Sequence, residues 1–162
     1  MPTSTYVALA TETLSGTATN VTFSSIPATY RDLILVIDGT ASASNTTVIF
    51  RLNGDTGSNY SYVWMYGTGS GSPVSNAGTD DGLAGGALSN TQSSITMQLF
   101  DYSATDKHKS ALIRRDMPSS FVLQSASRWA NTDAVTSITA YVDSPGETLQ
   151  IGTTLSLYGI AS

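Results

Sequence analysis

Residues 48–66 read VIFRLNGDTGSNYSYVWMY, and this stretch decides the fold. Two runs with strand character flank a turn rich in Asn, Gly, Asp and Ser, which accept positive φ or bond back to the nearby main chain. In the second run the aromatic residues share one parity, so a strand would carry four on one face: Tyr60, Tyr62, Trp64 and Tyr66. The pattern predicts a β-hairpin that bears this aromatic stripe.

Further short runs with strand character follow one another along the chain, separated by Gly, Pro, Asn and Asp. The most apolar run, DLILVID at residues 32–38, is apolar at both parities, which predicts a central strand covered on both faces. One weak helix candidate covers residues 125–135. The other strands are predicted at residues 6–14, 20–23, 94–100, 110–115, 121–126, 137–142 and 154–160.

Eight to ten short strands with almost no helix signal predict an all-β fold, an antiparallel β-sandwich. Long cross-connections and the lack of a Cys-Trp-Cys pattern favour a jelly-roll-like sandwich over an immunoglobulin-like one. We expect a single domain over residues 1–162, with an N-terminal arm at residues 1–6. Residues 67–86 contain seven glycines and a proline without hydrophobic period, and they are predicted to form a long exposed loop.

Composition restricts the partners and the location. Only 12% of residues are charged, about half the usual share, and 24 Ser and 23 Thr supply the polarity instead. A net charge of -5 with seven Lys and Arg argues against a nucleic-acid partner. The absence of cysteine excludes thiol chemistry and is compatible with a reducing cytoplasm. Because no secretory signal or spanning apolar run is present, we expect neither export nor a membrane partner.

Residues for catalysis or for a cofactor form no recognisable motif. The single histidine, His108, lies in a polar run without a Gly-x-Ser-x-Gly elbow, so a solvated loop histidine is favoured over a hydrolase base. Gly67, Gly69 and Gly71 lack the third-glycine spacing of a dinucleotide fingerprint. We therefore expect no enzyme activity and no cofactor.

Oxygen ligands of the kind that calcium prefers occur at Asn53, Asp55, Asn59, Asp80 and Asp81. A complete calcium loop would need more regularly spaced carboxylates and a closing Glu, which this stretch lacks. Turn-forming hydrogen bonds are therefore the favoured role of these side chains, and we assign no metal site.

The aromatic stripe has two interpretations. Exposed flat aromatics pack against sugars, and a neutral hydroxyl-rich surface would suit a glycan platform. Buried aromatics fill sandwich cores and subunit interfaces, which is the favoured interpretation. Four arginines are candidates for ion pairs between subunits, although ordinary surface placement is favoured for each of them: Arg51, Arg114, Arg115 and Arg128.

Several segments resemble a group of small β-rich virion proteins of tailed bacteriophages, including phages of cyanobacteria. The opening segments are ALATETL (8–14), VTFSSIP (21–27) and YRDL (30–33). The middle segments are FRLNGD (50–55) and NYSY (59–62), and the late ones are WAN (129–131), VTSI (135–138) and LSLYGI (155–160). Similar domains occur in tail or fibre proteins and as separate small proteins on capsids.

The resemblance implies a capsid decoration, or cement, protein: a non-enzymatic sandwich that binds the major capsid protein on the outer capsid surface. Such a protein assembles in the host bacterial cytoplasm and stabilises the finished shell. The threefold positions of a shell favour a homotrimer. The alternative is a tail-fibre or head-fibre domain that binds host cell-surface glycan. A cellular carbohydrate-binding module would also explain the aromatics, but not the missing signal peptide or catalytic domain.

Overall fold

The computed structural model describes residues 5–69, 71–117 and 121–161, and the regular structure in these ranges consists of β-strands alone. The first six strands are β1 (Tyr6–Thr13), β2 (Asn20–Phe23), β3 (Asp32–Gly39), β4 (Thr46–Leu52), β5 (Tyr60–Gly67) and β6 (Val74–Asp80). The other six are β7 (Leu83–Leu88), β8 (Ser93–Phe100), β9 (Lys109–Met117), β10 (Phe121–Trp129), β11 (Ile138–Val142) and β12 (Thr154–Ile160).

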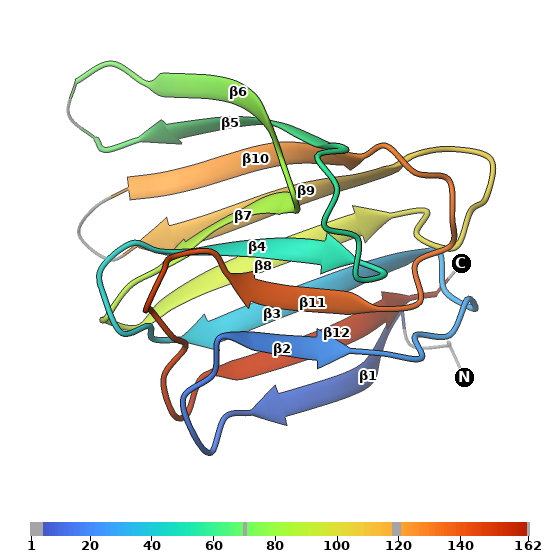
Figure 1. Ribbon diagram of the computed structural model, residues 1–162, viewed down its shortest axis with the longest axis horizontal. Helices are drawn as coiled ribbons and strands as arrows, with labels where there is room; N and C mark the ends of the chain where they lie inside the picture. The colour runs from blue at the N-terminus through green and yellow to red at the C-terminus, as the bar shows by residue number, and fades with distance from the viewer. Residues whose placement is uncertain (1–4, 70, 118–120, 162) are drawn as a thin grey trace.

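The strands form two sheets in which the neighbours are antiparallel (Figure 1). The larger sheet has the order β1-β12-β3-β8-β9-β10-β5-β6, and the smaller has the order β2-β11-β4-β7. The all-β sandwich confirms the predicted fold class, although the described residues hold twelve strands rather than eight to ten. The jelly-roll-like connectivity stays a prediction. Of the expected arm at residues 1–6, residues 1–4 lie outside the described part, and Tyr6 begins β1.

The two sheets enclose one hydrophobic core. From the larger sheet it includes Leu33, Leu35, Ile37, Met97, Leu99, Ile113 and Leu155, and from the smaller sheet Val48, Phe50, Leu52, Ile138 and Ala140. Most of these side chains alternate along their strands with exposed or half-buried ones, which is the period of two that a half-covered sheet requires. Strand β4 departs from this period, because Ile49, between Val48 and Phe50, is buried as well. Burying each large apolar side chain contributes roughly 1.5–3 kcal/mol to the sandwich.

Strand β3 lies inside the larger sheet, as expected, but it is covered on one face only. Ile34 and Val36 are half-buried on the outer face, so the prediction of a strand covered on both faces is wrong. Their cross-strand neighbours on that face include Tyr158 and Gln98, whose side chains are large enough to shield the aliphatic ones.

The predicted hairpin over residues 48–66 does not form. Strand β4 pairs with β7 and β11 in the smaller sheet, whereas β5 pairs with β6 and β10 in the larger one. The turn chemistry was located correctly, since Asn53 and Gly54 have φ values of 53° and 70°. Residues 53–59 therefore carry the chain from β4 in the smaller sheet to β5 in the larger one.

The predicted loop at residues 67–86 is also wrong for most of its length. It contains β6 and the first part of β7, which leaves residues 68–73 and a two-residue link as connections. Strand β6 is the edge of the larger sheet and carries small or polar side chains with no apolar period. Strand β7 reads LAGGAL and is largely buried. Its central residues are small, so the sequence lacks the alternation of bulky apolar and polar residues by which strands are recognised.

The helix candidate at residues 125–135 is replaced by the end of β10 and an irregular segment. Ser125, Ser127 and Trp129 point inward and are buried, while Ala126 and Arg128 are exposed. Burial therefore alternates with a period of two, as in a strand. Two of the buried positions are serines, so a pattern of hydrophobic residues does not reveal this period.

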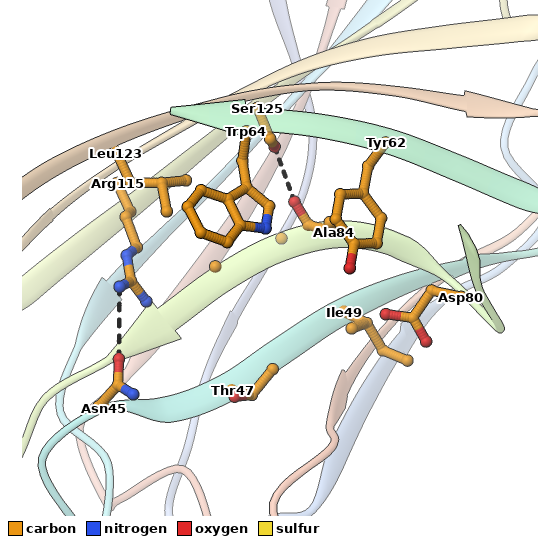
Figure 2. Close-up of a pocket in the computed structure, with 12 residues that line it drawn as sticks. Asn45, Thr47, Ile49, Tyr62, Trp64, Asp80, Ala84, Arg115, Leu123 and Ser125 are labelled. Carbon is orange, nitrogen blue, oxygen red and sulfur yellow. Dashed lines mark hydrogen bonds between the residues drawn. The ribbon is translucent and has the colours of Figure 1, made fainter. Parts of the chain in front are cut away.

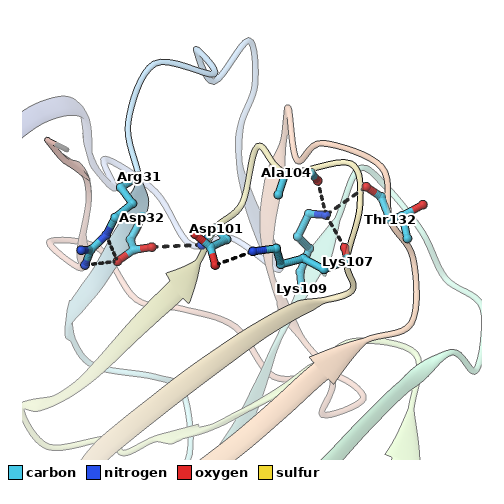
Figure 3. A network of polar contacts seen from close by, with 7 residues as sticks. All are labelled: Arg31, Asp32, Asp101, Ala104, Lys107, Lys109 and Thr132. Carbon is cyan, nitrogen blue, oxygen red and sulfur yellow. Dashed lines mark hydrogen bonds and ion pairs between the residues drawn. The ribbon is translucent and has the colours of Figure 1, made fainter.

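A buried lysine fixes the loop between β8 and β9 (Figure 3). Lys109 Nζ donates hydrogen bonds to the carbonyl oxygens of Ala104 (2.6 Å), Lys107 (3.0 Å) and Thr132 (3.0 Å), and its side chain is fully buried. Burial lowers the pKa of Lys109. Beside it, the main-chain N–H of Asp101 donates to Asp32 (3.0 Å). These bonds replace the water that the loop carbonyls would otherwise need.

Candidate binding groove

The aromatic stripe points inward, but its members have different roles. Tyr60 is buried in the core and stacks on Trp129, with ring centroids 6.2 Å apart. Its hydroxyl accepts a hydrogen bond from the N–H of Leu52 (3.1 Å) and donates to the carbonyl of Asp55 (3.2 Å). Burial raises the pKa of Tyr60 to about 12. Tyr60 therefore fits the core interpretation.

The other three aromatics of β5 lie toward β7, the edge strand of the smaller sheet, which contacts β5. Tyr62, Trp64 and Tyr66 are half-buried, and the rings of Trp64 and Tyr66 meet at 5.7 Å with an interplanar angle of 32°. In Figure 1, the β5–β6 hairpin lies at one end of the larger sheet, past β7. Three aromatic residues are therefore only partly buried near the edge of the smaller sheet.

A groove of about 240 Å³ lies at this boundary (Figure 2). Its walls come from β4 and β7 of the smaller sheet and from β5, β6, β9 and β10 of the larger one. It is lined by Asn45, Thr47, Ile49, Tyr62, Trp64, Asp80, Ala84, Gly85, Gly86, Arg115, Leu123 and Ser125. The groove thus combines aromatic rings with amide, hydroxyl, carboxylate and guanidinium groups.

A β-bulge in β7 shapes the wall of the groove. Val48 pairs with Gly86 and Ile49 pairs with Ala84, so Gly85 is an extra residue in β7. Gly86 has φ of +103°, and a Cβ there would lie 2.6 Å from Arg115 Cδ. Bulges re-aim the chain in this way beside functional sites, and the missing side chain leaves room for the arginine stem. Ser125 Oγ donates to the Ala84 carbonyl (2.8 Å) and links β10 to β7 beneath the groove.

The groove has opposite charges at its two ends. The Arg115 side chain lies at one end, and Asp80 lies at the other, past Tyr62, as Figure 2 shows. Arg115 is only 5% exposed, and its Nη2 donates to the Asn45 side-chain oxygen (3.3 Å). Burial lowers the pKa of Arg115 to about 10. Asn45 itself has φ of 72°, a conformation that asparagine accepts more readily than most residues.

Arg51 lies outside this groove and has partners within the chain. Its guanidinium pairs with Asp81 at 2.5 Å and stacks on the ring of Tyr141, 3.9 Å from the centroid. Burial, followed by the charges of Asp81 and Asp80, raises the pKa of the nearby Asp143. The structure therefore gives Arg51 a role in joining β4 to the β6–β7 link and to β11.

Arg114 and Arg115 are neighbours in sequence but point to opposite faces of β9. Arg114 is exposed on the outer face of the larger sheet. Four large apolar side chains, between 41% and 59% exposed, lie on the same face: Val63, Met65, Leu112 and Val122. We call these four residues the outer apolar face. Isolated exposed apolar residues are ordinary, but a group on three adjacent strands is typical of an interaction surface.

The oxygens considered for calcium are used mostly in turn hydrogen bonds. Asp55 accepts bonds from Gly57 N (2.8 Å), Asn59 Nδ2 (2.8 Å) and Trp129 Nε1 (2.7 Å). Burial would raise the pKa of Asp55, but the three hydrogen bonds together lower it. The side-chain oxygen of Asn53 accepts bonds from the N–H groups of residues 136 and 137. Within the described residues no group of three His, Cys, Asp or Glu side chains could hold a metal ion.

Sequence reasoning found the groove aromatics and Arg115, but missed Asn45, Asp80 as a groove residue, Ser125 and Gly86. The residue types of Asn45 and Gly86 could have indicated positive φ at these positions, because asparagine and glycine often occupy such backbone conformations. Their convergence depends on strand pairing between β4 and β7, which local patterns did not reveal. Among the described residues no helix is long and apolar enough to cross a membrane.

No protein-family model matches the chain. No curated protein matches it either. Among solved structures, alginate lyase Aly36B is 14% identical, with 81% of this chain and 68% of that chain covered and a TM-score of 0.32. A double mutant of the same lyase with alginate tetrasaccharide gives 0.30 over the same shares. A protein of unknown function from Shewanella oneidensis MR-1 is 8% identical, with 97% and 80% covered and a TM-score of 0.22. Similarity at this level carries no argument about function.

Proposed function

We propose that the chain is a non-enzymatic structural protein of a tailed-phage virion, namely a capsid decoration protein. In this proposal it assembles in the host bacterial cytoplasm, binds the major capsid protein on the outer capsid surface and stabilises the shell, without nucleic acid, membrane or cofactor. The observation that carries the proposal is the resemblance of its opening, middle and late segments to small β-rich virion proteins.

The contacts between these segments support a shared domain type. Asn53, in the middle segment, accepts hydrogen bonds from the main-chain N–H groups of Thr136 (2.8 Å) and Ser137 (3.1 Å), in the late segment. Trp129, which begins another late segment, bonds to Asp55 in the middle one. The segments of the resemblance therefore contain residues that hold the sandwich together, which is what a common fold would require.

The outer apolar face supplies a surface for the shell. It consists of Val63 and Met65 on β5, Val122 on β10 and Leu112 on β9. Arg114 lies beside it and, like Arg128, is an exposed member of the four arginines considered for subunit contacts. The strand register places the exposed Gln124 between Met65 and Arg114, so polar side chains lie among the apolar ones. Methionine and arginine are both enriched at protein interfaces. A homotrimer at the threefold positions of the shell would use the remaining edges of the sandwich.

Binding to the assembled shell alone would stabilise it by mass action, because the shell can come apart only after the bound copies have been released. A rebinding experiment tests this role. Particles of the encoding phage that lack the protein are mixed with purified chain, and bound protein is measured after sedimentation. Met65→Asp places a charge in the outer apolar face and should weaken binding about tenfold or more.

Thr11→Asp is the matched control, since Thr11 is exposed on β1 near the other edge of the larger sheet. It should bind the shell as the unchanged chain does. Equal binding by both variants and the unchanged chain would contradict the assignment of the outer apolar face. Failure of the unchanged chain to bind such particles would contradict the decoration role itself.

A further inference from the structure

The groove between β7 and β5 offers a flat surface and two ends of opposite charge. Trp64 and Tyr62 both line the groove, and Tyr62 lies on the side of Trp64 that faces Asp80 (Figure 2). Both residues are half-buried, so the sandwich holds their positions while part of each residue stays exposed. The volume of about 240 Å³ is below the roughly 300–1,000 Å³ of pockets for drug-sized ligands, so the groove suits one ring-sized unit.

Arg115 gives one end of the groove a preference for a carboxylate. The Arg115 guanidinium bonds to the Asn45 side chain, and its aliphatic stem packs closely against Gly86. The arginine side chain therefore has little conformational freedom left to lose when a ligand binds. A planar guanidinium matches a carboxylate in two parallel hydrogen bonds, and the attraction is stronger where water is largely excluded. The net charge of -5 gives the rest of the molecule no general attraction for anions.

The other end of the groove suits hydroxyl groups. Asp80 carries a carboxylate there, and an ionised carboxylate only accepts hydrogen bonds. A ligand with a carboxylate at one end, a ring in the middle and hydroxyl donors at the other end would therefore match all three features.

We propose that this groove binds a single carboxylate-bearing sugar residue of an acidic saccharide. The sugar ring lies on Trp64, its carboxylate meets Arg115 and Asn45, and its hydroxyls donate toward Asp80. This inference goes beyond the virion role and does not depend on it, because it concerns the inner groove rather than the outer apolar face.

Binding is tested on the full chain with a panel of oligosaccharides containing galacturonate, glucuronate, mannuronate, guluronate or sialate. The indole N–H signals in a proton–nitrogen NMR spectrum report on Trp64, with the buried Trp129 as an internal control. At least one acidic probe should shift the Trp64 signal and leave that of Trp129 in place. A panel without any shift at Trp64, or with a shift at Trp129 alone, would overturn the proposal.

Charge recognition is tested with the best uronate probe and its methyl ester, which has the same skeleton without the charge. For the unchanged chain the acid should bind about tenfold or more tightly than the ester, a typical effect of hydrogen bonds between charged groups. Arg115→Gln should abolish this difference, whereas Arg114→Gln, on the opposite face of β9, should keep it. Equal affinity of the unchanged chain for acid and ester would refute the role of Arg115, and that comparison needs no variant.

Discussion

The indole N–H of Trp129 donates a hydrogen bond of 2.7 Å to the Asp55 carboxylate, which joins the end of β10 to the turn between the two sheets. The same carboxylate accepts from Gly57 and Asn59, so one side chain organises the turn and fixes it to the larger sheet. The connection that leaves the smaller sheet is thereby held against the core in which Trp129 stacks on Tyr60.

Asp55→Asn should destabilise the protein by about 1–2 kcal/mol at neutral pH, because bonds to a charged acceptor become bonds to a neutral amide. The pKa of Asp55 is lower in the folded chain, so its stabilisation is complete above the unfolded pKa of about 3.9 and is lost as the pH falls through the folded pKa. Urea unfolding between pH 3 and pH 7 measures both effects. A variant with the same slope of stability against pH as the unchanged chain would contradict this account.

Tyr60 should make the protein sensitive to alkali. Burial raises its pKa to about 12, above the ordinary value of 10.0, so the unfolded chain releases the phenol proton first. The free energy of unfolding should therefore fall as the pH rises from 10 toward 12. Tyr60→Phe should lose about 1 kcal/mol at neutral pH and show less of this decline in denaturant titrations. A decline as steep in the variant would assign the effect to another group.

Lys109→Met should cost at least about 2 kcal/mol, because it removes a buried charged donor from three carbonyl oxygens. Lys107→Met is the matched control, since the Lys107 side chain is 51% exposed and pairs with Asp101 at the surface. The control should change the free energy of unfolding by less than about 1 kcal/mol. Equal unfolding midpoints for the two variants would show that the buried bonds do not stabilise the loop.

Gly86→Ala should both destabilise the protein and disturb the groove. The variant adds a Cβ 2.6 Å from Arg115 Cδ at a φ of +103°. Gly69→Ala tests the backbone alone, because Gly69 has φ of +77° with no atom within 4 Å of the added Cβ. The control should lose about 1–2 kcal/mol, and Gly86→Ala should lose more in thermal or urea unfolding. A smaller loss for Gly86→Ala would contradict the close packing of the arginine stem.

The sequence predicted local features well and pairings poorly. Strands with bulky alternation, such as β2 and β12, were predicted with their observed bounds, because the period of two records which side chains are buried. Strand β7 was not predicted, because Gly85 and Gly86 have no side chains that could show an alternating pattern of hydrophobicity. The turn after β4 was recognised, but residues 53–59 do not specify which sheet receives β5.

The candidate site was predictable in part for the same reason. Parity placed Trp64 and Tyr62 on one face of a strand, since alternate residues along a strand point to the same face. Arg114 and Arg115 were grouped together as candidates for subunit contacts, whereas the structure places them on opposite faces of β9. Asn45 and Asp80 reach the groove only through the packing of one sheet on the other. Contacts of that kind join residues far apart in sequence and leave no local pattern.

The most direct test of the proposed virion role is the copy number of this chain in purified particles of the phage that would encode it under that proposal. Quantitative mass spectrometry would compare it with the major capsid protein in the same sample. A decoration protein predicts one copy per capsid subunit or a simple fraction of that ratio. A handful of copies per particle would contradict the decoration role and favour the fibre alternative, and absence from the particles would contradict both.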